Sequence, residues 1–315
     1  MNDMKKVDLH LHLDGSLSCS LVKKLCEEIQ IDYQGKTAEQ LMMVSGNCSS
    51  LSEYLDCFDL PTRVLQTEQA LTLSAYDLVK RLDADGVVYA EIRFAPQLHK
   101  RGGLSQQQAV EAVLKGVELA VAEQVAVKIG ILLCMMVDGS YIDNRETAEL
   151  CKAYWKKGVI GMDLAGPEGA VPLERFGELF KIADREGVPF TIHAGECGDY
   201  ENVVKAISFG ARRIGHGCGA VFSRECIELL RRERIVVETC PVSNLQTKAV
   251  KSIEEHPIRR FFDMGVLVTV NTDNLTVSNT SLEREYSILK EKLGFTDNEL
   301  EYMNEIAFQA GFLFV

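Results

Sequence analysis

The sequence lacks the segments that would send it into a membrane or out of the cell. Its N-terminus has no continuous apolar stretch of the signal-peptide type. No segment approaches the roughly 18 apolar residues that span a bilayer. It also lacks a block of Lys and Arg, and its net charge of −12 disfavours phosphate-rich partners. We therefore expect no membrane or nucleic-acid partner, and nothing indicates an obligate protein partner.

The ten cysteines include no CxxC pair. Paired thiols at that spacing typify structural zinc sites and redox motifs, and the PCxxC zinc motif of cytidine-deaminase-type folds is missing as well. In a chain of 315 residues without an export signal, these cysteines are typical of reduced and mostly buried thiols. The sequence thus predicts a cytoplasmic protein.

Apolar runs rich in β-branched residues recur along the chain, with amphipathic stretches between several of them. Strands that alternate with helical patterns indicate βαβ units and a parallel sheet. Eight such runs predict a closed (β/α)8 barrel, and we expect residues 1–315 to form one domain. The segment from Leu17 to Leu82 is mostly helical in pattern and predicts an insertion over the barrel mouth. The predicted strands are Val7–Leu13, Val87–Phe94, Val127–Val137, Val159–Leu164, Pro189–His193, Arg213–His216, Ile235–Thr239 and Val266–Asn271.

The first predicted strand carries two histidines on one face. In VDLHLHLD (7–14), strand geometry separates the apolar residues from Asp8, His10, His12 and Asp14. Two histidines at this spacing are able to chelate one metal ion, because imidazole is a common zinc ligand. The alternative is a polar face with two hydrogen-bonded histidines, and the motif alone leaves both possibilities open.

Other predicted strands end in the same kinds of residue. His193 and His216 end the fifth and sixth strands, and Asp273 follows the eighth. Alone, each has an ordinary alternative as a hydrogen-bonded histidine or a helix cap. Barrel enzymes keep their active sites at the C-terminal ends of the strands, so all these groups are expected to converge there. We therefore predict a zinc site held by His10, His12, His193 and Asp273.

Glu196 lies three residues beyond His193, close to this predicted site. A carboxylic acid beside a metal-activated water can donate and accept protons, although a helix-start residue is the alternative. The fourth predicted strand contains no lysine that a second metal would use as a bridge. One metal ion per chain is therefore expected.

Short motifs stand at nearly every predicted strand end. They are HLHLDGS (10–16), EIRFAP (91–96), DLAGPE (163–168), HAGE (193–196), IGHG (214–217), CPVSN (240–244) and VTVNTDN (268–274). Each motif is weak alone, but the set, which runs in order from residue 5 to about residue 290, resembles that of the adenosine deaminase family. The resemblance implies a mononuclear zinc barrel in which activated water attacks C6 of adenosine or 2′-deoxyadenosine, releasing ammonia as part of purine salvage.

The resemblance also implies roles for individual residues. Glu196 would protonate purine N1, and His216 would orient or deprotonate the attacking water. Gly166 would offer its backbone N–H to purine N3, and Asp14 would accept from a ribose hydroxyl, with His12 as a further substrate contact. Leu51, Tyr54, Leu55 and Phe58 resemble an apolar lid, although an ordinary helix face has the same spacing.

Two positions bear on the choice of substrate. Adenine deaminases of this superfamily tend to have HLEG where this chain has HLDG, and N6-methyl-AMP deaminases tend to have HLNG. Asp14 would repel a 5′-phosphate but is able to bind a hydroxyl, which favours a nucleoside. Many family members have TDD where this chain has TDN (272–274). In those members the last acid is expected to bind purine N7 and must be protonated to donate, whereas the NH2 group of Asn274 would donate at every pH. Deamination of another 6-aminopurine, or a non-catalytic binding role on the same fold, are the alternatives.

Overall fold

The computed structural model describes residues 5–33, 35–46 and 48–314. Eight strands alternate with helices, and hydrogen bonds order them as two parallel sheets, β1-β2-β3-β4 and β5-β6-β7-β8. The predicted parallel α/β fold is confirmed, and each predicted strand lies within a few residues of an observed one. The strands are β1 (Lys6–His12), β2 (Val87–Phe94), β3 (Lys128–Met136), β4 (Val159–Ala165), β5 (Thr191–Ala194), β6 (Arg213–His216), β7 (Val236–Thr239) and β8 (Leu267–Val270).

The two sheets meet at both of their outer edges. At one seam, the Met162 N–H donates to the Pro189 carbonyl at 3.2 Å, next to β5. At the other seam, the His12 N–H donates to the Asp273 carbonyl and the Asp273 N–H donates to the His10 carbonyl, both at 2.8 Å. These contacts join β4 to β5 and β8 to β1, as a closed (β/α)8 barrel requires. Closure places the ends of β1 and β8 next to one another.

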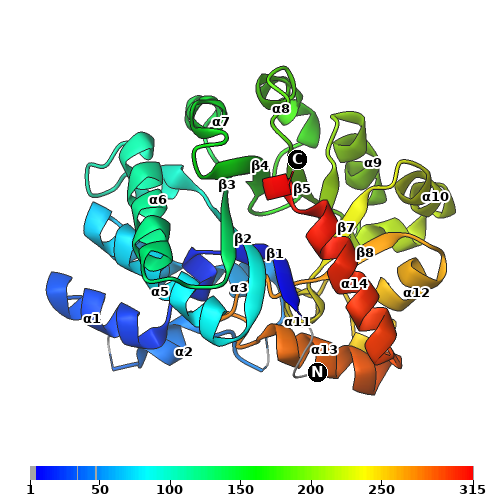
Figure 1. Ribbon diagram of the computed structural model, residues 1–315, viewed down its shortest axis with the longest axis horizontal. Helices are drawn as coiled ribbons and strands as arrows, with labels where there is room; N and C mark the ends of the chain where they lie inside the picture. The colour runs from blue at the N-terminus through cyan, green and yellow to red at the C-terminus, as the bar shows by residue number, and fades with distance from the viewer. Residues whose placement is uncertain (1–4, 34, 47, 315) are drawn as a thin grey trace.

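Helices surround the strands as an outer layer (Figure 1). Their apolar faces pack on the strands, and within the described part of the chain no helix is both long and apolar enough to cross a bilayer. The C-terminal helix α14 lies along β8 and β1. The helices of this layer are α5 (Glu68–Ala84), α6 (Gln106–Ala122), α7 (Tyr141–Tyr154), α8 (Gly177–Asp184), α9 (Tyr200–Ser208), α10 (Arg224–Arg232), α12 (Ile258–Asp263), α13 (Leu282–Leu293) and α14 (Asp297–Ala310).

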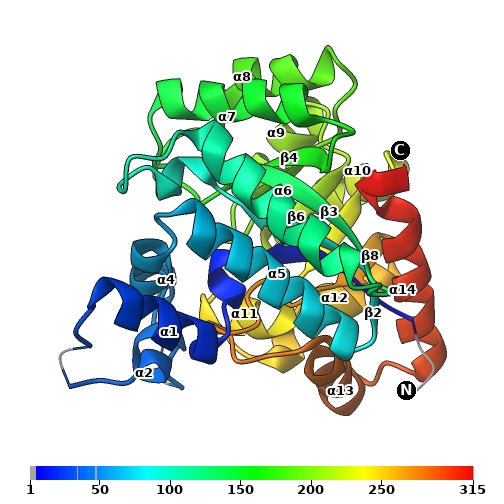
Figure 2. The same ribbon diagram turned by 60° about the vertical axis from the view of Figure 1, so that its left-hand side comes forward.

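The predicted helical insertion between β1 and β2 is present. Helices α1 and α2 stand to one side of the outer layer, as both ribbon views show (Figure 2). The last helix of the predicted segment, α5, packs on β2 and α6 and is the crossover helix of the first βαβ unit. The short elements before it are η1 (Asp14–Ser16), α1 (Cys19–Ile29), α2 (Ala38–Met42), α3 (Leu51–Asp56) and α4 (Asp59–Val64).

Side-chain caps define where many of these helices begin. The Ser105 hydroxyl accepts from the Gln108 N–H at 3.2 Å, and the Gln108 side chain accepts from the Ser105 N–H at 3.0 Å. Thr296 and Glu299 form the same reciprocal box at the start of α14. Such caps satisfy N–H groups that have no partner within the helix. The first turn therefore forms at a position that is set by residues next to it in the sequence.

Two further short helices follow the strands on the side of the barrel that carries the site. Helix α11 (Pro241–Gln246) comes directly after β7, and the 3-10 helix η4 (Cys218–Phe222) comes directly after β6. Pro241 occupies the first turn of α11, where its missing N–H costs nothing. These segments bring polar side chains against the ends of the neighbouring strands.

Candidate active site

A cavity of about 240 Å³ opens at the C-terminal ends of the strands. Every residue that the sequence predicted for catalysis, substrate binding or metal binding lines this cavity except His10, which lies against its floor in contact with His193 and Asp273. The predicted residues in the lining are His12, Asp14, Gly166, His193, Glu196, His216, Asp273 and Asn274. The structure therefore brings together predicted residues from the ends of five strands, namely β1, β4, β5, β6 and β8.

The four predicted metal ligands form a closed ring of short contacts. His193 Nε2 lies 3.1 Å from His10 Nε2 and 3.2 Å from His12 Nε2. Asp273 Oδ1 lies 3.5 Å from His10 Nε2 and 3.4 Å from His12 Nε2. Neighbouring ligands of a tetrahedral zinc ion with bonds of about 2.0–2.1 Å are roughly 3.3 Å apart, so each of these four separations is compatible with two ligands of one metal ion. His10 also lies close enough to share a metal ion with His193 and His216, and with Cys240 and Asp273.

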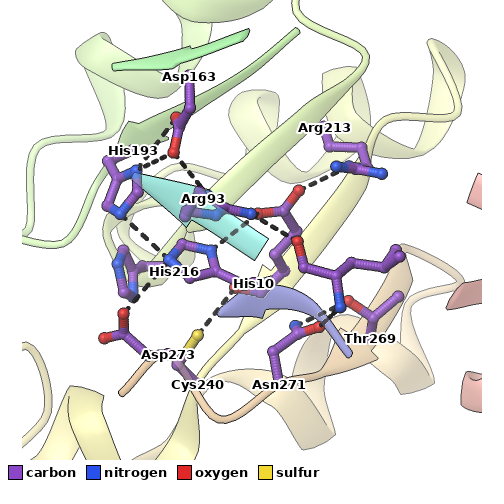
Figure 3. Close-up of polar contacts among 12 residues, drawn as sticks. His10, Arg93, Asp163, His193, Arg213, His216, Cys240, Thr269, Asn271 and Asp273 are labelled. Carbon is purple, nitrogen blue, oxygen red and sulfur yellow. Dashed lines mark hydrogen bonds and ion pairs between the residues drawn. The ribbon is translucent and has the colours of Figure 1, made fainter. Parts of the chain in front are cut away.

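The orientation of two of these histidines is set by carboxylates behind them. His10 Nδ1 lies 2.8 Å from Glu238 Oε2, and His193 Nδ1 lies 3.0 Å from Asp163 Oδ2. Figure 3 shows His193 between Asp163 and His10. Because an ionised carboxylate only accepts, both rings donate from Nδ1, which leaves Nε2 of each ring to face the other. This carboxylate–histidine pattern is the usual support of a metal-binding histidine.

The ring of contacts calls for a cation at its centre. One proton is able to bridge one pair of facing nitrogens, such as Nε2 of His10 and Nε2 of His193. That proton does not satisfy the third imidazole, His12, or the carboxylate of Asp273, whose contacts within the ring are 3.2–3.5 Å long. A metal ion that accepts from all four groups at once removes these conflicts, and the N/O donor set suits zinc.

Asp273 is held in place by its backbone and by a neighbouring hydroxyl. Its φ of +59° is in the left-handed region, which non-glycine residues adopt mainly where the surroundings enforce it. The Ser243 hydroxyl donates to Asp273 Oδ2 at 2.5 Å, so Oδ1 is the oxygen that faces the histidines. Burial alone would raise the pKa of Asp273, but His10, His12 and His216 lower it below its usual range. The carboxylate therefore stays ionised.

Two buried arginines connect the supporting carboxylates. Arg93 donates from Nη1 to Asp163 at 2.7 Å and from Nη2 to Glu238 at 2.9 Å. Arg213 donates from Nε to Glu238 at 2.6 Å and pairs through Nη2 with Glu91. Burial alone would raise the pKa of Glu238, but Arg93 and Arg213 hold it well below its usual range. The barrel interior thus fixes the supporting carboxylates as anions.

Glu196 and His216 face the same cavity beside the ring. Glu196 Oε2 lies 3.9 Å from His216 Nε2, and both side chains are buried. Burial, followed by the nearby charge of Asp273, raises the pKa of Glu196 to about 7. Burial, followed by His10, lowers the pKa of His216 well below its usual value. A buried acid that holds a proton near neutral pH is suited to proton transfer.

The rest of the cavity suits a flat ligand with polar edges. Gly166 has a φ of +106°, which a side chain would strain, and a Cβ there would lie 3.2 Å from the Met136 side chain. Asp14 is buried, which raises its pKa to about 6. Asn274 donates from Nδ2 to the Tyr54 hydroxyl at 2.8 Å, while its Oδ1 has no hydrogen-bond partner.

Helix α3 and Phe58, two residues beyond its end, cover one side of this cavity. Tyr54 hydrogen-bonds Ser278 at 2.7 Å, which ties the helix to the segment after β8. All four residues with lid-like spacing in the sequence contribute to the lining, namely Leu51, Tyr54, Leu55 and Phe58. The apolar face is therefore directed at the cavity rather than only at the barrel wall.

Several residues of the site were not assigned a role from the sequence. Arg93 and Asp163 lie within quoted motifs, but only the ion pairs show their function, and Glu238 lies in no quoted motif. The sequence did contain a signal for these residues, because a charged residue within an otherwise apolar buried strand requires a partner of opposite charge or a hydrogen bond. Cys240 also lies near His10 and Asp273. Burial raises the pKa of its thiol, which disfavours the thiolate that a metal would need.

The chain is similar to known proteins along nearly its whole length. A family model described as Adenosine deaminase matches residues 5–314. A protein named Adenosine deaminase from Haemophilus ducreyi is 44% identical, covering 98% of this chain and 91% of that protein. The solved adenine deaminase from Arthrobacter aurescens has a TM-score of 0.88 at 26% identity, covering 98% of this chain and 94% of the other. The solved N6-methyl-AMP deaminase from Arabidopsis thaliana has a TM-score of 0.87 at 27% identity, covering 98% of this chain and 92% of the other.

Proposed function

This chain belongs to the adenosine deaminase family, and from its site we infer that it catalyses the hydrolytic deamination of adenosine to inosine and ammonia. We extend the proposal to 2′-deoxyadenosine, to one zinc ion per chain and to a role in purine salvage. The observation that carries it is the ring formed by His10, His12, His193 and Asp273, beside which a buried acid faces the same cavity. Zinc, when bound, makes water a nucleophile near neutral pH.

Glu196 is the proton donor in this proposal. Attack at C6 places negative charge on the purine ring, and a proton delivered to N1 neutralises it. The pKa of Glu196, raised to about 7 by burial, keeps a large fraction of this carboxyl protonated in the metal-free site. Such proton transfer contributes about 10²–10⁴-fold to a rate. His216 lies on the same side of the cavity and is placed to contact the attacking oxygen.

We assign the substrate-binding roles to residues that line the cavity. The Gly166 backbone N–H would donate to purine N3, and Asn274 would donate to N7. His12 is the last residue of β1 and would be a further substrate contact, and Asp14, the first residue of η1, would accept from a ribose hydroxyl. The Asp14 carboxylate would repel a 5′-phosphate on the substrate, so the proposal favours a nucleoside over a nucleotide.

The discriminating experiment compares four substrates on zinc-loaded protein of measured metal content. Adenosine, adenine, AMP and N6-methyl-AMP are tested side by side, with ammonia release as the readout. We expect adenosine to have the highest kcat/KM. A preference for adenine, AMP or N6-methyl-AMP would refute the substrate assignment and support a different 6-aminopurine deaminase. Protein that binds no zinc and releases no ammonia would refute the enzyme assignment.

We also propose that the protein acts in the cytoplasm on its small-molecule substrate alone. Ten cysteines are free, and seven of them are buried, which is typical of a chain kept reduced. The net charge of −12 supports the absence of a nucleic-acid partner.

A further inference from the structure

The ring of His216 has a second hydrogen bond on the side away from the cavity. Its Nδ1 lies 2.9 Å from Nδ2 of Asn244, which is fully buried in α11. Beyond Asn244 lies His256, whose Nε2 is 3.1 Å from the Asn244 Oδ1. Neither Asn244 nor His256 lines the cavity, so this chain of side chains reaches the site only through His216.

The direction of this hydrogen-bond chain is fixed by backbone N–H groups, which only donate. The Ile258 N–H donates to His256 Nδ1 at 3.2 Å, so His256 carries its hydrogen on Nε2 and donates to Asn244 Oδ1. The Cys240 N–H donates to the same oxygen at 3.3 Å. Two donors therefore hold the amide oxygen of Asn244, and its NH2 group must face His216.

The consequence for His216 follows from its ring chemistry. A neutral imidazole has one N–H and one bare nitrogen, and the nitrogen that faces an NH2 group must be the bare one. His216 then carries its hydrogen on Nε2, the atom that lies 3.9 Å from Glu196 Oε2 on the cavity side. A hydrogen on Nδ1 would place two donors 2.9 Å apart, and turning the amide would place NH2 against Cys240 and His256.

We propose that Asn244 and His256 are positioning residues that hold His216 as the Nε2–H tautomer. His216 then donates a hydrogen bond to the oxygen that attacks the purine and has no free lone pair with which to remove a proton from it. The inference rests on the proposed function for its catalytic meaning. The tautomer itself is a property of the folded site and can be measured without any substrate. Of the two roles that the sequence left open for His216, orienting the water is the one that this geometry supports.

The first test is nitrogen NMR on zinc-loaded protein in which histidine carries ¹⁵N. The chain has six histidines. Only His216 and His256 are expected to show hydrogen on Nε2 with a bare Nδ1. His10, His99 and His193 donate from Nδ1 to an oxygen. His12 directs Nε2 at the ligand ring and is expected to bind zinc through that atom, with its hydrogen on Nδ1. Signals are assigned by the loss of one histidine at a time. A hydrogen on Nδ1 of His216 in the unmodified protein overturns the proposal.

The second test replaces Asn244 by its isostere in N244D. Both side-chain oxygens then accept, so His216 is expected to gain hydrogen on Nδ1, and kcat is expected to fall by about 10²-fold with little change in KM or zinc content. Loss of one donor at a developing oxyanion has an effect of this size. N304D is the matched control, because Asn304 of α14 is also buried but accepts from the Val7 N–H near the start of β1, at the opposite end of the barrel from the site. A bare Nδ1 in N244D, or an equal fall of kcat in N304D, refutes the assignment.

The third test uses His256 and remains informative if N244D does not fold. H256L removes one donor to the amide of Asn244, and we expect some Nδ1–H form of His216 and a fall in kcat of about fivefold, the effect of one ordinary hydrogen bond. H256Q retains a donor and is expected to restore both values. H256L with an unchanged His216 spectrum overturns the role of His256. If the predicted tautomer is present but adenosine is not converted, the proposed function fails while this inference stands.

Discussion

Two buried glutamates offer a direct test of how charge is stabilised in this barrel, because we predict opposite effects for the same substitution. Glu238 and Glu285 are both fully buried. Glu238 accepts from Arg93, Arg213 and His10. Glu285 accepts only from neutral groups, the Val242 N–H at 3.1 Å and the Thr280 hydroxyl at 2.6 Å. We expect E238Q to destabilise the protein and E285Q to stabilise it at neutral pH.

The expected loss in E238Q follows from its partners. Every group that reaches this carboxylate is a donor, so either orientation of a glutamine places NH2 against Arg213 or against His10 and Arg93. Removing one member of a buried ion pair costs about 3–5 kcal/mol. Each arginine retains one other carboxylate, so we expect a loss near the lower end, about 3 kcal/mol. Because His10 loses its supporting anion, the zinc affinity is expected to fall by about 10–100-fold.

The expected gain in E285Q depends on pH. Burial raises the pKa of Glu285 to about 8, from 4.5 in the unfolded chain. The folded protein therefore holds a proton that the unfolded chain has lost between these values. Stability is fully present below about pH 4.5 and falls as pH rises towards 8, by at most about 1.4 kcal/mol per pH unit. Glutamine removes this loss, because it donates to Thr280 while accepting from Val242.

Denaturant unfolding of zinc-saturated protein at pH 5 and pH 7.5 measures both effects. E285Q should exceed the unmodified protein by less than about 1 kcal/mol at pH 5 and by about 3–4 kcal/mol at pH 7.5. E238Q should be less stable than the unmodified protein at both pH values. The fold holds the pKa of Glu238 well below its usual value, so the ionised carboxylate stabilises the unmodified protein throughout this pH range. An equal loss of unfolding free energy in the two variants would refute the view that the arginines decide whether a buried glutamate stabilises the protein. An E238Q protein with unchanged stability and zinc content would refute it as well.

Three further predictions concern the cavity. E196Q should retain zinc, because Glu196 lies outside the ligand ring, while kcat falls by at least about 10²-fold; loss of zinc measured by metal analysis would show that its role is misassigned. G166A should lower kcat/KM for adenosine by about tenfold, because a φ of +106° strains alanine by about 1–3 kcal/mol; unchanged kinetics would refute the close approach of substrate to Gly166. N274D should make kcat/KM fall as pH rises through the pKa of the new acid, because only its protonated form donates to N7; a pH profile parallel to that of the unmodified protein would refute that contact.

Much of the site could be predicted because its residues follow a rule that is visible in the chain. Strand ends of a parallel barrel meet at one mouth, so polar residues directly after apolar runs are brought together wherever the strands pair in order. His10 and His12 required only strand alternation, and His193 and Asp273 required only the positions of two strand ends. Closure at the seam between β8 and β1, where Asp273 pairs with the backbone of β1, then supplies the short distances.

The supporting residues were harder to foresee, because their partners are distant in sequence and have no shared periodicity. Arg93 reaches Glu238 across 145 positions, and His256 reaches His216 only through Asn244. A charged residue in an apolar strand indicates that a partner exists but does not say which one. The direction of a hydrogen-bond chain is further hidden, because it depends on single backbone N–H groups that no residue pattern encodes.

The buried charges of the barrel also explain why one divalent cation suits this site. Four carboxylates and two guanidinium groups are joined there by ion pairs or by the ligand ring: Glu91, Asp163, Glu238, Asp273, Arg93 and Arg213. With neutral histidines, this group has two negative charges in excess. An uncompensated buried charge costs several kcal/mol, so the folded barrel is stabilised by a bound ion of charge +2. The excess negative charge of this group therefore favours a divalent cation over a monovalent one, on electrostatic grounds that are independent of the ligand distances.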